Sequence, residues 1–167
     1  MDVDFIIKHL GLEPLPGEGG YYKETYRSDD ILTVDALPSR YTVEKRLGTA
    51  IYYLVTEGTF SALHHLPSDE IFHFYLGDPV RMLQLYPDGT GKTFVLGNDL
   101  AEGHLPQVTV PRYTWQGMRL IRGGRFALMG TTVAPSFDFH DLELGDRKIL
   151  AAGYPEFKDI IELLTNN

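Results

Sequence analysis

Hydrophobic and polar positions alternate in short runs over most of the chain, from about residue 21 to residue 133. Each run is rich in Val, Ile, Tyr, Phe and Thr, and Gly, Pro, Asp or Asn separates it from the next, as in strands joined by turns. The runs are YYKETYR (21–27), TAIYYLV (49–55), EIFHFYL (70–76), VRMLQLY (80–86), KTFVLG (92–97), PQVTV (106–110) and RFALMGTTV (125–133). The segments PDGTG (87–91) and GGR (123–125) predict hairpin turns. Many short, evenly spaced strands predict an all-β sandwich or closed barrel.

Helical patterns stand at the two ends. Phe5, Ile6 and Leu10 form an apolar face, with an aspartate available as cap before them and Gly11 as the end of the helix. Residues 12–20 hold two prolines and three glycines and predict a loop. The segment YPEFKDIIELLT (154–165) predicts a second helix with a proline in its first turn. Without linkers or repeats, the pattern predicts one domain over residues 1–167, with a barrel core of about residues 20–150.

Composition narrows the class of protein. The 167 residues are 43% hydrophobic and 23% charged, an ordinary globular mixture. The absence of cysteine excludes disulfides, thiolate catalysis and cysteine-based zinc sites. A net charge of −8 disfavours nucleic acid and anionic membranes as partners. The sequence shows neither a signal peptide nor a long apolar span, so we expect a cytoplasmic protein.

The most informative segment is GTFSALHHLPSDEIFHFYLG, residues 58–77. Its spacing of Gly58, His64, Glu70 and Gly77 resembles the first motif of the cupin superfamily. That motif has a second histidine two positions after the first, where this chain has Leu66. Because neighbouring strand residues face opposite sides, His65 points away from the barrel if His64 points into it.

A second segment, VPRYTWQGM (110–118), resembles the second cupin motif with two departures. Pro111 matches, Tyr113 replaces a glycine, and Gln116 stands at the place of a ligand histidine. With GEGGYYKETYRS, TAIYYLV and TTVAPSFDFHDLELG, these segments look like the uncharacterised "cupin 5" family over about residues 10–150. The resemblance implies an RmlC-like jelly roll, or double-stranded β-helix, with short terminal helices. It also implies a homodimer, and it leaves the reaction open.

The resemblance places His64 and Glu70 in the barrel interior as the candidate catalytic pair. Metal-binding cupins use three His and one Glu, so we expect no tightly held metal or other cofactor here. A divalent ion, if bound, would be held by His64, Glu70 and Gln116. The candidate substrate-binding residues are Gln116, Tyr22, Tyr52, Arg27, Phe72 and His73.

Two further expectations concern the rim of the pocket. Glu24 and Arg27 are three apart on a strand and therefore face opposite sides, which leaves Arg27 as a candidate anion clamp. Phe137 and Asp138 are expected to form a lid over the barrel mouth.

Three functions remain open, each with a small molecule as the partner. The first is an epimerase or isomerase that transfers a proton on a carbohydrate or nucleotide-sugar-like substrate. In it, His64 is the base, Glu70 orients the imidazole, and a tyrosine or Gln116 donates to the oxyanion. The second is a non-catalytic binding or sensing protein. The third is a metal-dependent oxygenase or isomerase with a reduced ligand set.

Overall fold

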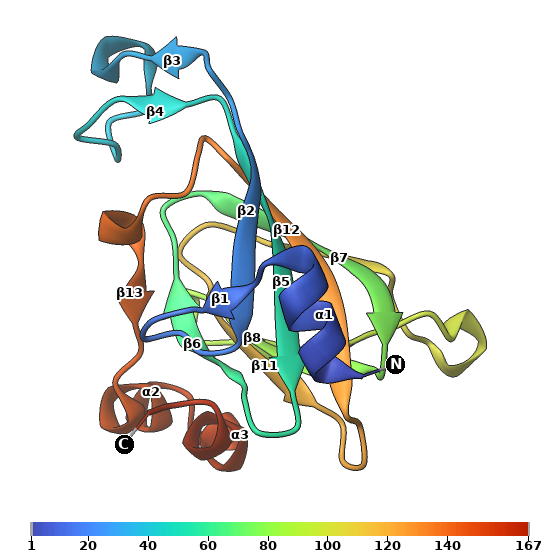
Figure 1. Ribbon diagram of the computed structural model, residues 1–167. Coiled ribbons are helices and arrows are strands. Elements are labelled where there is room, and N and C mark those ends of the chain that lie inside the picture. Colours follow the sequence, from blue (N-terminus) through green and yellow to red (C-terminus); the bar gives the residue numbers. More distant parts are fainter. Residues whose placement is uncertain (1, 167) are drawn as a thin grey trace.

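Two antiparallel sheets face each other in the computed structural model, which describes residues 2–166 (Figure 1). The six-stranded sheet has the order β1 (Glu13–Pro14), β2 (Tyr21–Arg27), β5 (Thr49–Thr56), β12 (Phe126–Ala134), β7 (Asp69–Gly77), β10 (Gln107–Val110). The five-stranded sheet has the order β13 (Glu143–Leu144), β6 (Ser61–His65), β11 (Trp115–Leu120), β8 (Val80–Leu85), β9 (Gly91–Leu96). The fold is the predicted all-β jelly roll, and its sheets keep open edges instead of closing into one barrel.

The main core lies between the sheets because alternate strand residues point inward. On β5, Tyr53 and Val55 enter this core while Leu54 faces outward. On β8, Met82 enters it while Leu83 faces outward. Each sheet therefore also has an apolar outer face, which helices cover.

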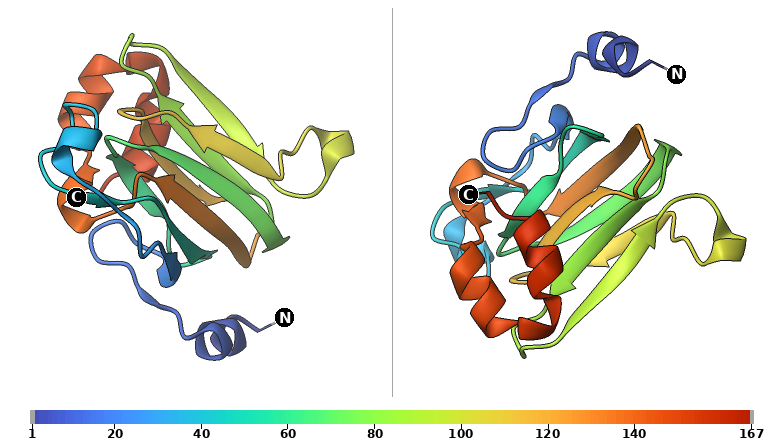
Figure 2. Two further views of the ribbon diagram at one scale, coloured as in Figure 1. Left: turned by 90° about the horizontal axis from the view of Figure 1, so that it is seen from above. Right: turned by 90° about the horizontal axis from the view of Figure 1, so that it is seen from below.

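Helix α1 (Val3–Leu10) is capped by Asp2, one of the two aspartates available there, and ends at Gly11 in the left-handed conformation. Its buried Ile6 packs with Leu54 and Leu128 on the outer face of the six-stranded sheet. Figure 2 shows α1 and the two C-terminal helices on opposite sides of the molecule. No helix within residues 2–166 has the length and apolar character needed to cross a membrane.

The C-terminal segment departs from the single predicted helix. Helix α2 (Arg147–Gly153) comes first, because Asp146 caps it by accepting from the Ile149 amide at 2.9 Å. A 3-10 turn (Pro155–Phe157) then leads into α3 (Lys158–Leu163). Side chains of both helices pack on outward residues of the five-stranded sheet; the buried members of this cluster are Leu63, Leu83, Leu85, Leu150, Ile161 and Leu164.

All seven predicted runs are strands. PDGTG is the hairpin turn between the paired strands β8 and β9, whereas GGR, also predicted as a hairpin turn, joins β11 to β12 in the other sheet. Strand β11 was not predicted, because WQGMRL contains a glycine and polar residues at positions that a strand pattern would fill with apolar ones. Gly117 belongs there because a Cβ would come within 2.8 Å of the Ser61 carbonyl oxygen on β6. Strand β6 and four two-residue strands also lie outside the predicted runs, but β11 is the strand that carries Gln116.

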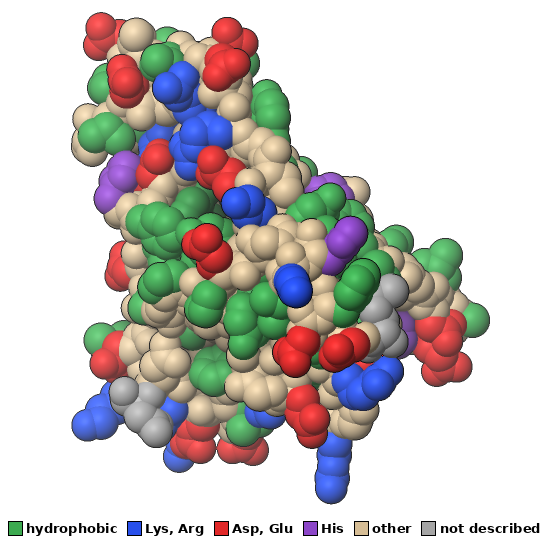
Figure 3. Space-filling view, in the orientation of Figure 1, with side chains coloured by type: hydrophobic (Ala, Val, Ile, Leu, Met, Phe, Trp, Pro, Cys, Tyr) green, Lys and Arg blue, Asp and Glu red, His purple; other side chains and the backbone are tan. Residues whose placement is uncertain are grey.

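A two-stranded arm, β3 (Ile31–Leu32) and β4 (Lys45–Arg46), projects from one end of the sheets (Figure 1). Figure 3 shows acidic, basic and hydrophobic side chains together on this arm. Its base is joined to the segment after β12, where Lys45 Nζ lies 2.7 Å from Asp138 Oδ2 and 2.5 Å from Asp141 Oδ2. The side chain of Lys45 has no exposed surface, so this contact fixes the segment next to the candidate site.

Candidate functional site

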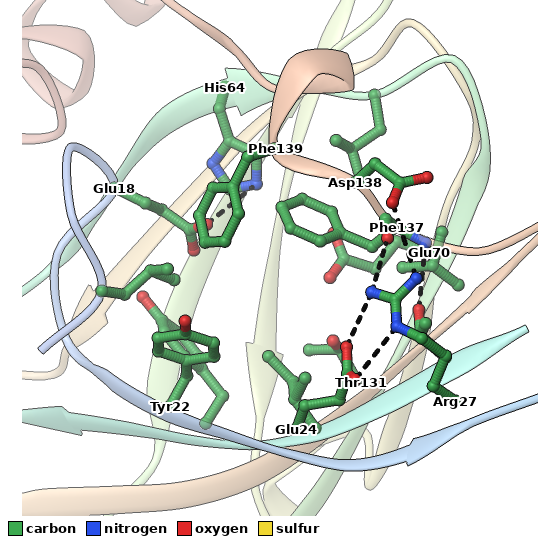
Figure 4. Close-up of a pocket in the computed structure, with 16 residues that line it drawn as sticks. Glu18, Tyr22, Glu24, Arg27, His64, Glu70, Thr131, Phe137, Asp138 and Phe139 are labelled. Carbon is green, nitrogen blue, oxygen red and sulfur yellow. Dashed lines mark hydrogen bonds and ion pairs between the residues drawn. The ribbon is translucent and has the colours of Figure 1, made fainter. Parts of the chain in front are cut away.

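A cavity of about 270 Å³ opens at the arm end of the jelly roll (Figure 4). Four of the predicted site residues line it: His64, Glu70, Tyr22 and Arg27. In Figure 4, Glu18 and His64 lie on one side of the cavity and the Arg27 ion pairs on the other. The other lining residues are Leu15, Glu18, Glu24, Thr49, Ile51, Tyr53, Leu66, Thr131, Val133, Phe137, Asp138 and Phe139.

His64 is held in one tautomer by its neighbours. It lies on β6, and its Nδ1 is 2.7 Å from the Ala62 carbonyl oxygen. A carbonyl oxygen only accepts, so Nδ1 carries the hydrogen, and Nε2 of the neutral ring is left with a lone pair. Gln116 Nε2 lies 2.7 Å from this Nε2 and therefore donates to it.

Gln116 also donates to Glu70, so the amide bridges the two predicted catalytic residues. Its Nε2 lies 3.0 Å from Glu70 Oε2. The sequence predicted that Glu70 would orient the imidazole directly and that Gln116 would face a substrate. Both expectations are wrong in geometry: Ala62 and Gln116 orient His64, and both amide hydrogens of Gln116 are used inside the protein. Gln116 Oε1 is buried without a hydrogen-bond partner.

Burial raises the pKa of Glu70 from an ordinary value of 4.5 to about 7. The nearby His64 lowers this pKa, the negative charge of Glu18 raises it, and a hydrogen bond from Thr131 lowers it, so burial remains the dominant cause. A buried carboxyl of this kind exchanges a proton near neutral pH, which suits general acid–base chemistry.

Glu18 belongs to the site, although the sequence analysis did not select it. It is buried, its Oε1 accepts from the Ser61 hydroxyl at 2.9 Å, and its Oε2 lies 3.7 Å from His64 Nε2. One feature of the sequence could have indicated it: Glu18 is a charged residue among the glycines of GEGG, at the start of the segment GEGGYYKETYRS that resembles the family. The Tyr53 hydroxyl donates to the Gly19 carbonyl at 3.0 Å and thereby holds this loop.

Four predicted binding residues are not among those that line the cavity: Gln116, whose amide contacts are given above, and Tyr52, Phe72 and His73. Tyr52 faces outward and packs edge-on against Tyr75, with ring centroids 6.2 Å apart; its neighbour Tyr53 lines the cavity instead. Phe72 lies in the core between the sheets. His73 faces the other side of β7 and is hydrogen-bonded to Thr132 at 3.3 Å. For Tyr52 and His73 the correction follows from strand alternation, which separates neighbours such as Tyr52 and Tyr53, whereas Phe72 points inward but packs among the apolar core residues.

Arg27 and Glu24 form an ion pair, contrary to the prediction from simple alternation. A β-bulge shifts the register of β2 against β5 between Glu24 and Tyr26, which brings the two side chains to one face. Arg27 Nε and Nη2 donate to Glu24 at 3.0 and 2.8 Å, and Nη2 also donates to the Phe137 carbonyl at 3.1 Å. Arg27 therefore ties the rim together and is not a free anion clamp.

The segment predicted as a lid lines the cavity. Phe137, Asp138 and also Phe139 line the cavity, and Asp138 lies 3.5 Å from Arg27 Nη1. The Phe139 ring packs edge-on against Phe137 and Tyr22, at centroid distances of 5.2 and 6.3 Å. Aromatic rings therefore close one wall, while carboxylates dominate the polar lining.

The family pattern described as Cupin superfamily (DUF985) matches residues 4–145, which is most of the chain. The chain belongs to this cupin family. It is 31% identical over 132 residues to the Saccharomyces cerevisiae uncharacterized protein YML079W. That match covers 74% of this cupin and 66% of the yeast protein, so the cupin spans about two thirds of this relative.

Two solved structures place the cupin among its neighbours. Protein SO0799 from Shewanella oneidensis is 35% identical, with a TM-score of 0.87 and coverage of 99% of this chain and 98% of that one. Oxalate decarboxylase from Bacillus subtilis is 14% identical, with a TM-score of 0.54 over 92% of this chain and 37% of that one. The second likeness shows the fold alone.

The side chains of this cupin do not fit the metal site that its superfamily motifs imply. Leu66 brings an apolar side chain to the second ligand position, and Gln116 directs N–H donors at His64 and Glu70. A cation would need the lone pairs of His64 Nε2 and Glu70 Oε2 as ligands, and both already accept hydrogen bonds from the Gln116 amide. Within residues 2–166, no group of three His, Asp or Glu side chains is placed to hold a metal ion.

Proposed function

We propose that this cupin binds a small, neutral, hydroxyl-rich molecule of the carbohydrate class and moves a proton on it, as an isomerase or epimerase does. The observation that carries the proposal is the buried His64–Gln116–Glu70 chain beside an enclosed cavity. One proton-exchanging carboxyl, Glu70, is held at a fixed position there, next to a space that fits a small ligand.

The charge of the lining favours a neutral substrate over a nucleotide-sugar. Four carboxylates line the cavity, Glu18, Glu24, Glu70 and Asp138, against the single guanidinium of Arg27. A diphosphate would meet this negative field without a free cation to bind it, because Arg27 is already paired. The carboxylates instead accept hydrogen bonds from hydroxyl groups, and the aromatic wall suits the apolar face of a sugar ring.

In the proposed reaction, Glu70 is the base, which reverses the roles predicted from the sequence. Its carboxylate lines the cavity, and its pKa of about 7 lets it take a proton and return it at neutral pH. It removes the proton from a carbon next to a carbonyl and returns it to the neighbouring carbon on the same face of the enediolate. The hydroxyl proton passes through Tyr22 from one enediolate oxygen to the other, so no atom is gained or lost. The Tyr22 phenol, which also lines the cavity, donates to the enediolate oxygen. His64 is the positioning residue that receives the Gln116 amide.

Deuterium exchange tests the reaction on many candidate sugars in parallel. A panel of aldoses, ketoses and amino sugars is incubated with the protein in heavy water, and carbon-bound deuterium is measured by mass spectrometry. The wild type should label at least one sugar, and Glu70→Gln should slow labelling by about 100-fold or more. His65→Ala, a change on the opposite face of β6, is the matched control and should keep full exchange. Equal labelling by wild type and Glu70→Gln would refute the mechanism.

A non-catalytic binding role is the second candidate. It is favoured by the engagement of both His64 nitrogens and both Gln116 amide hydrogens inside the protein. Saturable sugar binding by calorimetry, together with no deuterium exchange in any bound sugar, would assign this cupin to the binding class.

A further inference from the structure

The Gln116 amide lies between two hydrogen-bond acceptors, one on His64 and one on Glu70. His64 Nε2 and Glu70 Oε2 both face its amide nitrogen, at 2.7 and 3.0 Å. An imidazole lone pair and a carboxylate oxygen are also the groups that bind divalent cations. In this chain the two amide hydrogens occupy them.

We infer that Gln116 takes the place of a metal ion in this cavity: its amide holds His64 and Glu70 together and excludes divalent cations. The inference does not depend on the proposed reaction, because cation binding is measured without a substrate. It gives Gln116 the part of a positioning residue that also determines which cofactor chemistry the cavity accepts.

The backbone fixes the amide at this point. Gln116 is paired with His64 across β6 and β11 and with Gln84 across β8 and β11. Its side chain is almost fully buried, with 1% relative exposure, so it has little room to turn away. The hydrogen bond from His64 Nδ1 to Ala62 keeps the imidazole lone pair directed at the amide.

The surroundings contain a further cation ligand once the amide is removed. Glu18 Oε2 is 3.7 Å from His64 Nε2, close enough for both to share one ion after a small side-chain movement. A carboxylate in place of the Gln116 amide would add oxygen lone pairs where N–H donors now stand. The buried group that prevents a three- or four-ligand site is therefore this one amide.

The test is Gln116→Glu, a change that keeps the shape of the side chain. Each protein is stripped with a chelator and dialysed against Mn²⁺ at about 10 μM, a concentration that separates tight from weak sites. Bound metal per chain and the Mn²⁺-dependent shift in Tm are then measured. The wild type should hold less than about a tenth of an equivalent, and Gln116→Glu should approach one equivalent with a raised Tm. Adding His64→Ala to Gln116→Glu should remove the gain.

Gln84→Glu is the matched control, because Gln84 is equally buried and adjacent on β8. It should be destabilised without gaining metal. Equal metal gain by Gln84→Glu and Gln116→Glu would overturn the inference, as would one tightly bound equivalent in the wild type.

If Gln116→Glu does not fold, the wild type still decides. Paramagnetic Mn²⁺ should leave the side-chain amide signals of Gln116 unbroadened in nitrogen-15 spectra, and selective broadening would overturn the inference.

Discussion

Glu70 links the cavity to the pH dependence of folding. Its pKa is raised by burial from 4.5 to about 7, so the folded state binds this proton more tightly than the unfolded state. The resulting stability is present in full below pH 4.5 and is lost as the pH rises towards 7. Above that pH, keeping the carboxylate buried costs on the order of 3 kcal/mol.

Glu70→Gln should remove this part of the pH dependence. The difference in unfolding free energy between pH 5 and pH 8 should shrink by about 2–3 kcal/mol, as measured by urea unfolding. Glu57→Gln, on an exposed carboxylate, is the control and should keep the wild-type profile. Identical profiles for Glu70→Gln and the wild type would contradict the raised pKa.

A second test asks which of the neighbouring tyrosines Tyr52 and Tyr53 faces the inside of the jelly roll. Tyr53→Phe removes the hydroxyl that donates to Gly19, which leaves a carbonyl of the Glu18 loop without its partner. We expect a loss of about 1–2 kcal/mol in unfolding free energy. Tyr52→Phe, on the outer face, should change it by less than about 0.5 kcal/mol. The opposite ranking would show that the strand register is wrong.

The sequence predicted elements better than it predicted the site. Runs such as TAIYYLV form strands because their branched and aromatic side chains pack on both faces of a sheet, and this property is local. The bulge that pairs Glu24 with Arg27 depends on the register of β2 against β5, which a single sequence does not contain. The Gln116 bridge depends likewise on the register of β6 with β11.

Site prediction failed where long-range contacts decide the outcome. His64 and Glu70 were found because a motif fixes their spacing. Glu18 comes from a distant loop, and its place in GEGG does not indicate that it contacts His64. The sequence predicted that residues 137–138 form a lid, but it did not indicate the contacts of Lys45 with Asp138 and Asp141 that hold this segment.

Lys45 connects the arm to the lid, and its removal tests that connection. Lys45→Met removes the buried cation that pairs with Asp138 and Asp141 and leaves Asp141 only the exposed His140 as a partner. It should cost about 3 kcal/mol, with faster proteolysis near residues 136–142. Lys158→Met breaks an exposed pair with Glu162 at 3.9 Å and should cost less than about 0.5 kcal/mol. Similar losses in both variants would mean that the buried contact contributes no more than a surface pair.

The surface of the whole molecule favours self-association, and we propose a homodimer. Large apolar side chains are exposed on and beside the arm: Tyr26, Ile31, Val34, Val43 and Leu47. A two-stranded arm without a core of its own gains stability when another surface covers it. Sedimentation equilibrium at micromolar concentration should give twice the chain mass. The mass of a single chain up to about 100 μM would rule out a stable dimer.

The most direct test of the metal-free, amide-bridged cavity is anomalous diffraction from crystals grown with Zn²⁺. We expect no anomalous peak between His64 and Glu70, and continuous density for the Gln116 amide between them. A peak about 2.0–2.2 Å from both His64 Nε2 and a Glu70 oxygen, with Gln116 displaced, would contradict it.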